Sequence, residues 1–295
     1  MKAINSLLKN NNLRANKYSK IGKNYVVDTN DGKYVINPKC NNKEIFDYLL
    51  TRNYNYHPNI IDSNDKYQLV PYIDDIGIPR EQKMNDLINN VSLLHSKTTY
   101  YKEIDESDYK QLYEDLTNNI AYLYEYYNDL ITIIDSKVYM SPDEYLLARN
   151  ISLIFKNLKY CEDEIQKWYD MIQDLKKVRV SVIHNNLSLD HFLQDNNDYL
   201  ISWDKARIDI PIFDLYKLYN KHATEFDFYD ILSLYEDKYP LKEEELKLFF
   251  ILISMPAKIE FNKDHYKMCL LIKNELTKLI KSHDLVTKCK AISKK

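Results

Sequence analysis

The stretch HNNLSLDHFL, residues 184–193, followed by YLISWD, residues 199–204, decides the fold of this chain. Between the two lies DNND, residues 195–198, and Asp and Asn favour turns. The pattern therefore predicts a short hairpin that pairs residues 192–194 with residues 199–201. Such a hairpin would hold positions 186, 191 and 202 around one cleft.

The same stretch resembles a motif of the aminoglycoside phosphotransferase and choline kinase family, which has the protein-kinase-like fold. In that family a segment reading roughly His-Gly-Asp-Leu-x-x-x-Asn-Ile-Leu precedes Ile-Asp-Trp-Glu and a later Asp-Leu. The matching residues are His184, Leu187, Leu193, Ile201, Trp203 and Asp214-Leu215. The resemblance implies scaffold roles for two of them: His184 braces the loop by hydrogen bonds, and Asp214 ties down its backbone.

The residues that carry the family's chemistry differ in this chain. The position of the catalytic Asp is Asn186, that of the metal-binding Asn is His191, and that of the metal-binding Asp is Ser202. Members with such departures resemble the kinase-like proteins associated with spore coats in Gram-positive bacteria, and this chain is most similar to those.

The first 73 residues are compatible with the small lobe of the same fold. Residues 25–29 and 33–36 are β-branched and aromatic runs that flank Asn30-Asp31-Gly32, which predicts a hairpin. The family has a phosphate-binding Lys at the end of a strand here, and the corresponding residue is Asn37. A helix is expected over 43–52, and the resemblance makes Glu44 the carboxylate that pairs with that Lys. A strand over 68–73 and a helix from about 79 to 95 complete this region.

The chain is therefore expected to have an α+β, two-lobed protein-kinase-like fold. The N-lobe, residues 1–73, is an antiparallel sheet with one helix, and the mainly helical C-lobe spans 74–295. Apolar residues at helical spacing predict further helices, over 107–135, 142–155, 163–176, 213–222, 227–238, 242–260 and 263–282. Ser141, Pro142 and Glu144 supply a capping box and a first-turn proline.

Glycine is scarce, with three in the whole chain. A loop that lets its backbone approach a phosphate closely needs glycine, and Gly22 is the candidate in the right place. The alternative is that Gly22 only makes a turn between two strands.

The substitutions remove the groups that phosphoryl transfer requires. The Asn186 amide can hold a hydroxyl group but is not a base. Magnesium prefers carboxylate oxygens, whereas imidazole suits zinc or copper and a serine is a weak neutral ligand. With Asn37 in place of the Lys, four roles are vacant, and no cofactor is expected.

Two charged residues could compensate. Lys39 and Asp204 each lie two positions beyond a lost group, so strand periodicity would place them on the same face, displaced by about 6.5–7 Å. ATP and Mg²⁺ would then be cofactors at a rearranged site. A zinc site made by His191 with Asp190 and Asp204 is a further alternative.

Composition narrows the function classes. The chain has 295 residues and a net charge of −3, so no attraction to nucleic acid is expected. Its four cysteines share no metal-ligand spacing and read as reduced thiols. Without a signal peptide or an apolar stretch of about 18 residues, a cytoplasmic protein is expected, and a spore-coat location would follow from the resemblance alone.

Three functions remain open. The first is a pseudokinase that serves as a binding or structural module with protein partners in an assembly. Alternatively, it is a small-molecule phosphotransferase with a rearranged ATP site, or a nucleotide sensor that needs no metal.

Overall fold

The computed structural model describes residues 2–40, 42–104 and 106–292. By its internal contacts the chain forms two compact units. Unit 1 contains Met1–Thr98 and Val182–Ile208, and unit 2 contains Thr99–Ser181 and Asp209–Lys295. Each unit combines two separate segments, and the lobe boundary after residue 73 stays a prediction.

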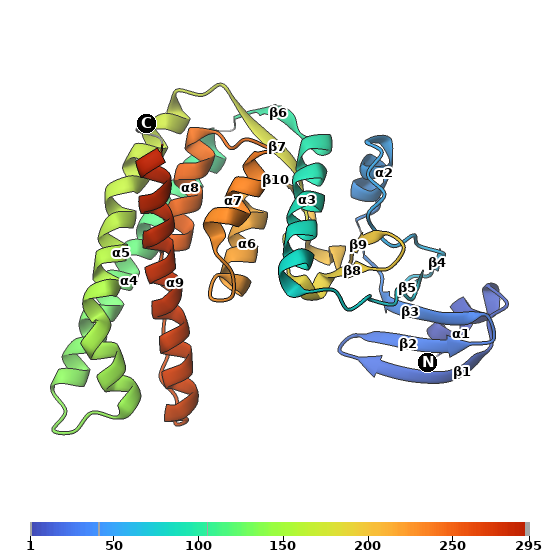
Figure 1. Cartoon of the computed structure of the whole chain (residues 1–295), viewed down its shortest axis with the longest axis horizontal. Helices are drawn as coiled ribbons and strands as arrows, with labels where there is room; N and C mark the ends of the chain where they lie inside the picture. Colours follow the sequence, from blue (N-terminus) through green and yellow to red (C-terminus); the bar gives the residue numbers. More distant parts are fainter. Residues whose placement is uncertain (1, 41, 105, 293–295) are drawn as a thin grey trace. The chain divides into compact units, whose positions relative to one another are not determined.

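Unit 1 contains a five-stranded antiparallel sheet in the order β1-β2-β3-β5-β4 (Figure 1). Its strands are β1 (Ala15–Ile21), β2 (Asn24–Thr29), β3 (Gly32–Pro38), β4 (Asp62–Ser63) and β5 (Tyr67–Pro71). Thr29 pairs with Gly32, so the predicted hairpin is confirmed, with Asn30-Asp31 as its two-residue turn. Gly32 lies at φ 112°, a conformation that L side chains rarely adopt.

One face of this sheet is covered by a helix that the sequence analysis missed. α1 (Lys2–Asn10) places Ile4 and Leu8 against Val27, Ile36 and Leu69. The signal was present, because the apolar residues at positions 4, 7 and 8 have helical spacing. The expected single helix of the N-lobe is therefore wrong: the described residues among 1–73 contain two helices.

The second helix of this region and the one that follows are confirmed. α2 (Lys43–Thr51) buries Leu49 but leaves Leu50 exposed. α3 (Arg80–Thr98) buries Val91, Leu94 and His95 near its end. Within the same unit, two short elements, η1 (Leu189–His191) and η2 (Trp203–Lys205), are turns of 3₁₀-helix around the hairpin.

The predicted hairpin itself is confirmed with its turn one residue shorter. β8 (Phe192–Gln194) pairs with β9 (Asp198–Leu200), and Phe192 lies opposite Leu200. The amide of Ile201 extends the ladder by donating to the carbonyl oxygen of His191 at 2.9 Å. A three-stranded sheet has the order β10-β7-β6, from β6 (Tyr100–Glu103), β7 (Lys177–Ile183) and β10 (Arg207–Asp209).

The helices of unit 2 are α4 (Glu106–Asp135), α5 (Pro142–Gln173), α6 (Ile212–His222), α7 (Phe228–Glu236), α8 (Glu243–Ser254) and α9 (His265–Ile292). α5 packs against α4, α8 and α9 (Figure 1). Two expectations are wrong. Helices 142–155 and 163–176 are one helix, because nothing between them breaks it. The helix expected over 242–260 ends at Ser254, just before Pro256, which cannot continue it.

The start of α5 follows its predicted capping pattern in part. The side chain of Glu144 accepts a hydrogen bond from the backbone amide of Ser141 at 2.9 Å. The Ser141 hydroxyl instead donates to the carboxylate of Asp143 at 2.6 Å.

Taken together, the antiparallel sheet and the helices confirm the α+β class. No helix in residues 2–40, 42–104 and 106–292 is long and apolar enough to span a bilayer. The four cysteines, which lie in this part of the chain, are free thiols.

Because Ile4 is fully buried against the sheet, Ile4→Ala should lower the free energy of unfolding by about 2–5 kcal/mol. Urea unfolding followed by Trp203 fluorescence, in a Trp168→Phe background, measures it, since the chain has two tryptophans. Lys9→Ala, an exposed change on the same helix, should stay within about 0.5 kcal/mol. Equal effects of the two variants would contradict the packing of α1.

Candidate functional site

His184 lies directly after β7 and is fully buried. Its Nε2 atom lies 2.8 Å from the carbonyl oxygen of Ile201, to which it donates. Its ring meets that of Trp203 edge-to-face, with centroids 4.9 Å apart. The side chain thus links the start of the loop to the segment that follows the hairpin.

The neighbouring histidine is also used within the loop. The Nδ1 atom of His191 lies 2.7 Å from the carbonyl oxygen of Asn186. A carbonyl oxygen can only accept, so Nδ1 carries a proton. The backbone carbonyl oxygen of His191 also accepts from the amide of Ile201 at 2.9 Å, and Ile201 precedes Ser202 in the chain. A cleft shared by positions 186, 191 and 202 stays a prediction.

The hairpin is fixed from both sides. The amide of Leu200 donates to the carbonyl oxygen of Tyr56 at 2.8 Å. Gln194 donates its own amide to the carboxylate of Asp75 at 3.0 Å and accepts from the amide of Ile76 at 2.7 Å. The segment before α3 therefore runs along the hairpin edge.

Ser202 has a left-handed backbone, with φ 67° and ψ 50°, and is half-buried. This conformation costs a residue other than glycine about 1 kcal/mol or more. It also ends the strand, because η2 begins at Trp203. The expectation that strand periodicity places Asp204 on the same face as Ser202 is therefore wrong: Asp204 lies in a 3₁₀ turn and is exposed.

The ring of Trp203 lies in an aromatic cluster that the sequence analysis did not identify. Besides His184, ring contacts join it to Phe46 at 5.9 Å, Tyr54 at 6.3 Å and His57 at 6.2 Å between centroids. The indole Nε1 donates to the carbonyl oxygen of Leu200 at 2.7 Å. The cluster joins α2 and the segment after it to the end of the hairpin.

A polar contact reinforces this link. The carbonyl oxygen of Trp203 accepts from Nδ2 of Asn42 at 2.6 Å and from the Cys40 thiol at 3.7 Å. Asn42 immediately precedes α2, so one side chain fixes the start of this helix to the loop. The only sequence signal for it was a helix-capping residue type at position 42.

The residues at the expected nucleotide-binding positions all lie in unit 1. Asn37 pairs with Gln68 across β3 and β5, and its buried Oδ1 atom has no hydrogen-bond partner in the described chain. Lys39 is exposed just beyond the end of β3. Glu44 is exposed in the first turn of α2, and none of the described ion pairs involves it.

Gly22 occupies the turn between β1 and β2. Ile21 pairs with Asn24, so Gly22 and Lys23 form a two-residue turn, and Gly22 has a left-handed φ of 59°. A role in holding phosphate stays a prediction. Asp214 belongs to unit 2, where it is fully buried in the first turn of α6.

The donor set does not suit the magnesium ions that the kinase fold implies. His191 offers nitrogen and already uses Nδ1 within the loop, and Ser202 offers a neutral hydroxyl, whereas Mg²⁺ prefers carboxylate oxygens. Within residues 2–40, 42–104 and 106–292, no three His, Cys, Asp or Glu side chains gather as a metal site. His191, Asp190 and Asp204, which are all among these described residues, are not gathered in this way.

Three solved structures have a fold similar to that of this chain. An aminoglycoside phosphotransferase from Alicyclobacillus acidocaldarius is 10% identical, with a TM-score of 0.76 over 97% of this chain and 95% of that one. The AMP-bound spectinomycin phosphotransferase APH(9)-Ia is 13% identical, with a TM-score of 0.59 over 91% and 93%. Choline kinase LicA from Streptococcus pneumoniae is 15% identical, with a TM-score of 0.50 over 97% of each chain.

The structural similarity shows the protein-kinase-like fold, whereas identities this low leave the activity open. By sequence, no family model and no curated protein matches the chain.

The buried His57 generates a prediction on pH. Burial lowers its pKa below the usual 6.5, and its Nε2 has no partner in the described chain. The imidazole then takes up a proton more readily in the unfolded chain than in the folded chain. The neutral, buried His57 therefore gives its full contribution to the free energy of unfolding above pH 6.5. This contribution falls as the pH drops toward the folded-state pKa, by at most about 1.4 kcal/mol per pH unit.

His57→Phe keeps a ring beside Phe46 and removes the titration. Urea unfolding at pH 7.5, 6.5 and 5.5 should therefore show a shallower acid loss for this variant than for the natural protein. His283→Gln, at an exposed position, should leave the profile unchanged. Parallel profiles for His57→Phe and the natural protein would refute the role of His57.

Proposed function

We propose that this chain is a kinase-like protein with a degenerate active site, a pseudokinase that acts as a binding or structural module. The fold is that of phosphotransferases, and the loop that holds their chemistry is ordered here by other means. ATP-dependent transfer to a hydroxyl group is not its function on this proposal.

The observation that carries the proposal is the hydrogen bond from His191 Nδ1 to the carbonyl oxygen of Asn186, at 2.7 Å. The resemblance assigns one of these positions to a metal ligand and the other to the catalytic base. Here the first side chain braces the backbone of the second. A group engaged in this way supports the loop without a metal ion.

Charge supports the same proposal. Asn37, Asn186 and Ser202 are neutral, so neither a clamp for phosphate nor a carboxylate for Mg²⁺ is present at the matched positions. Loss of a general base alone costs a rate factor of about 10²–10⁴. Loss of the metal ligands as well removes the charge stabilisation on which phosphoryl transfer depends.

The proposal requires no cofactor. Its main alternative is a phosphotransferase with a rearranged site for ATP and Mg²⁺, in which Lys39 and Asp204 replace the lost groups. Both side chains are exposed, and neither is held by a described ion pair. A nucleotide sensor that needs no metal would instead use the turn at Gly22.

The proposal also includes the partners and the location of the protein. Protein partners in an assembly fit a module without chemistry, and a cytoplasmic location fits its reduced thiols. A place in a spore coat depends on the sequence resemblance alone.

Thermal unfolding with ATP in EDTA, and with ATP and Mg²⁺, tests the proposal. A ligand at 100 times its Kd would stabilise the folded state by about 2.7 kcal/mol. The natural protein should show no rise of Tm that depends on Mg²⁺. The matched control restores the lost groups with Ser202→Asp, His191→Asn and Asn37→Lys, and it should gain such a rise.

Three outcomes separate the alternatives. A Mg²⁺-dependent rise in the natural protein contradicts the proposal, and loss of ATP turnover in Asp204→Ala would assign it the rearranged site. A rise with ATP in EDTA supports the sensor.

Turnover by the restored variant should appear only after Asn186→Asp is added, because that side chain would meet only the acceptor.

A further inference from the structure

One end of the helical unit 2 carries a group of exposed apolar side chains. The turn between α4 and α5 carries Val138 and Tyr139, which are 87% and 89% exposed, and Met140. The first turns of α9 add Tyr266, 74% exposed, and Leu270, one turn further on the same face. We call these five residues the helix-end patch. The α4–α5 turn and the start of α9 lie at the same end of unit 2 (Figure 1).

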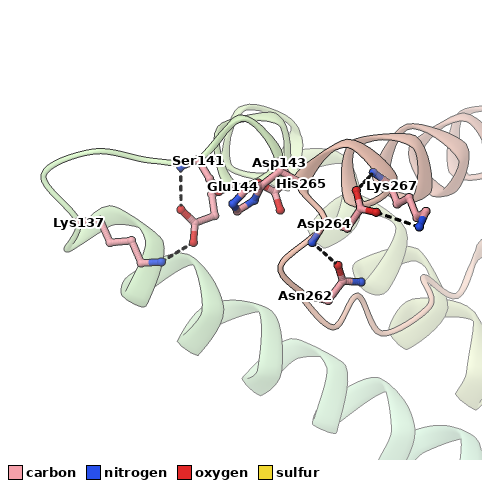
Figure 2. A network of polar contacts seen from close by, with 8 residues as sticks. All are labelled: Lys137, Ser141, Asp143, Glu144, Asn262, Asp264, His265 and Lys267. Carbon is pink, nitrogen blue, oxygen red and sulfur yellow. Dashed lines mark hydrogen bonds and ion pairs between the residues drawn. The ribbon is translucent and has the colours of Figure 1, made fainter.

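A buried carboxylate joins the two segments. Asp143, which is fully buried, accepts from the Ser141 hydroxyl at 2.6 Å and lies 2.8 Å from Nδ1 of His265 (Figure 2). Ser141 follows Met140, and His265 precedes Tyr266. The contact therefore holds both parts of the patch beside each other without covering either.

The turn is fixed at its other end as well. Glu144 accepts from the Ser141 amide and pairs with Lys137, the residue before Val138 (Figure 2). This pairing holds the pKa of Glu144 below its usual value, so the carboxylate stays charged at neutral pH. The exposed side chains are thus carried by a turn that is anchored on both sides, so little ordering is needed when they bind.

Two lysines beside the patch have acidic partners. Lys137 is satisfied by Glu144, and Lys267 lies 2.9 Å from Asp264. The other charges of the flanking segments, Asp135 and Lys263, have opposite signs. An identical patch facing this one would meet no excess of like charge.

We propose that the helix-end patch is a surface through which two copies of this chain associate. Exposed side chains of this size and number mark interaction sites, and Tyr and Met are enriched in protein interfaces. Two-fold association brings the same patch together from both copies, which the balanced charge permits. A membrane-binding surface would instead carry an excess of Lys and Arg.

The patch is small for a protein interface. Stable dimers bury about 20–30 residues a side, so five apolar side chains and their surroundings place this association among the weak ones. Weak dimerisation that depends on concentration is the consequence.

Sedimentation velocity of the full chain from about 5 to 200 μM tests the proposal over the range that weak association requires. The average mass should rise from the 35.3 kDa of one chain toward twice that value. The variant with Tyr139→Ser and Tyr266→Ser should stay monomeric at every concentration. Ile21→Ser, which changes a similarly exposed apolar residue of unit 1, should associate like the natural protein.

Salt provides a second readout. Because the contact is apolar, association should persist in 0.5 M NaCl. A natural protein that stays monomeric up to 200 μM would overturn the proposal, and so would a dimer that survives the double Tyr variant. Binding of the monomer to vesicles of neutral or anionic lipid, lost in the double variant, would assign the patch to a membrane and also overturn it.

Discussion

The packing of Trp203 is the interaction on which the loop of unit 1 depends. Its ring contacts His184, Phe46, Tyr54 and His57, and its carbonyl oxygen accepts from Asn42. These contacts come from residues 42–57 and from His184, two segments that are far apart in the sequence. Removing a large buried aromatic side chain from such a cluster typically costs about 3–5 kcal/mol. Ser202, directly before it, has a left-handed backbone.

A loop held in this way separates two properties that active phosphotransferases combine. The geometry of the loop is maintained by backbone carbonyl oxygens that accept from histidine and asparagine side chains. The chemistry would need charged groups at positions 37, 186 and 202, and these are neutral. On the function proposed above, the fold persists without the catalytic charges, because stability and chemistry depend on different atoms.

The sequence predicted the elements with strong local signals and missed those fixed by tertiary contacts. The hairpin 192–201 followed from its turn residues, and α4 from apolar spacing. α1 was missed although Ile4, Leu7 and Leu8 had helical spacing. The left-handed backbone at Ser202, which overturned the position expected for Asp204, has no local signal, because serine is not a residue type that favours this conformation. The role of Asn42 was hidden because its acceptor lies 161 residues away.

The central claim is that the loop is held by its own contacts and needs no metal ion. Amide hydrogen exchange of Leu200 and Ile201, whose amides donate to Tyr56 and His191, tests it most directly. The account predicts equal protection of these two amides with ATP in EDTA and with ATP and Mg²⁺. Exchange at both that becomes tenfold slower on adding Mg²⁺, equivalent to about 1.4 kcal/mol, would contradict it.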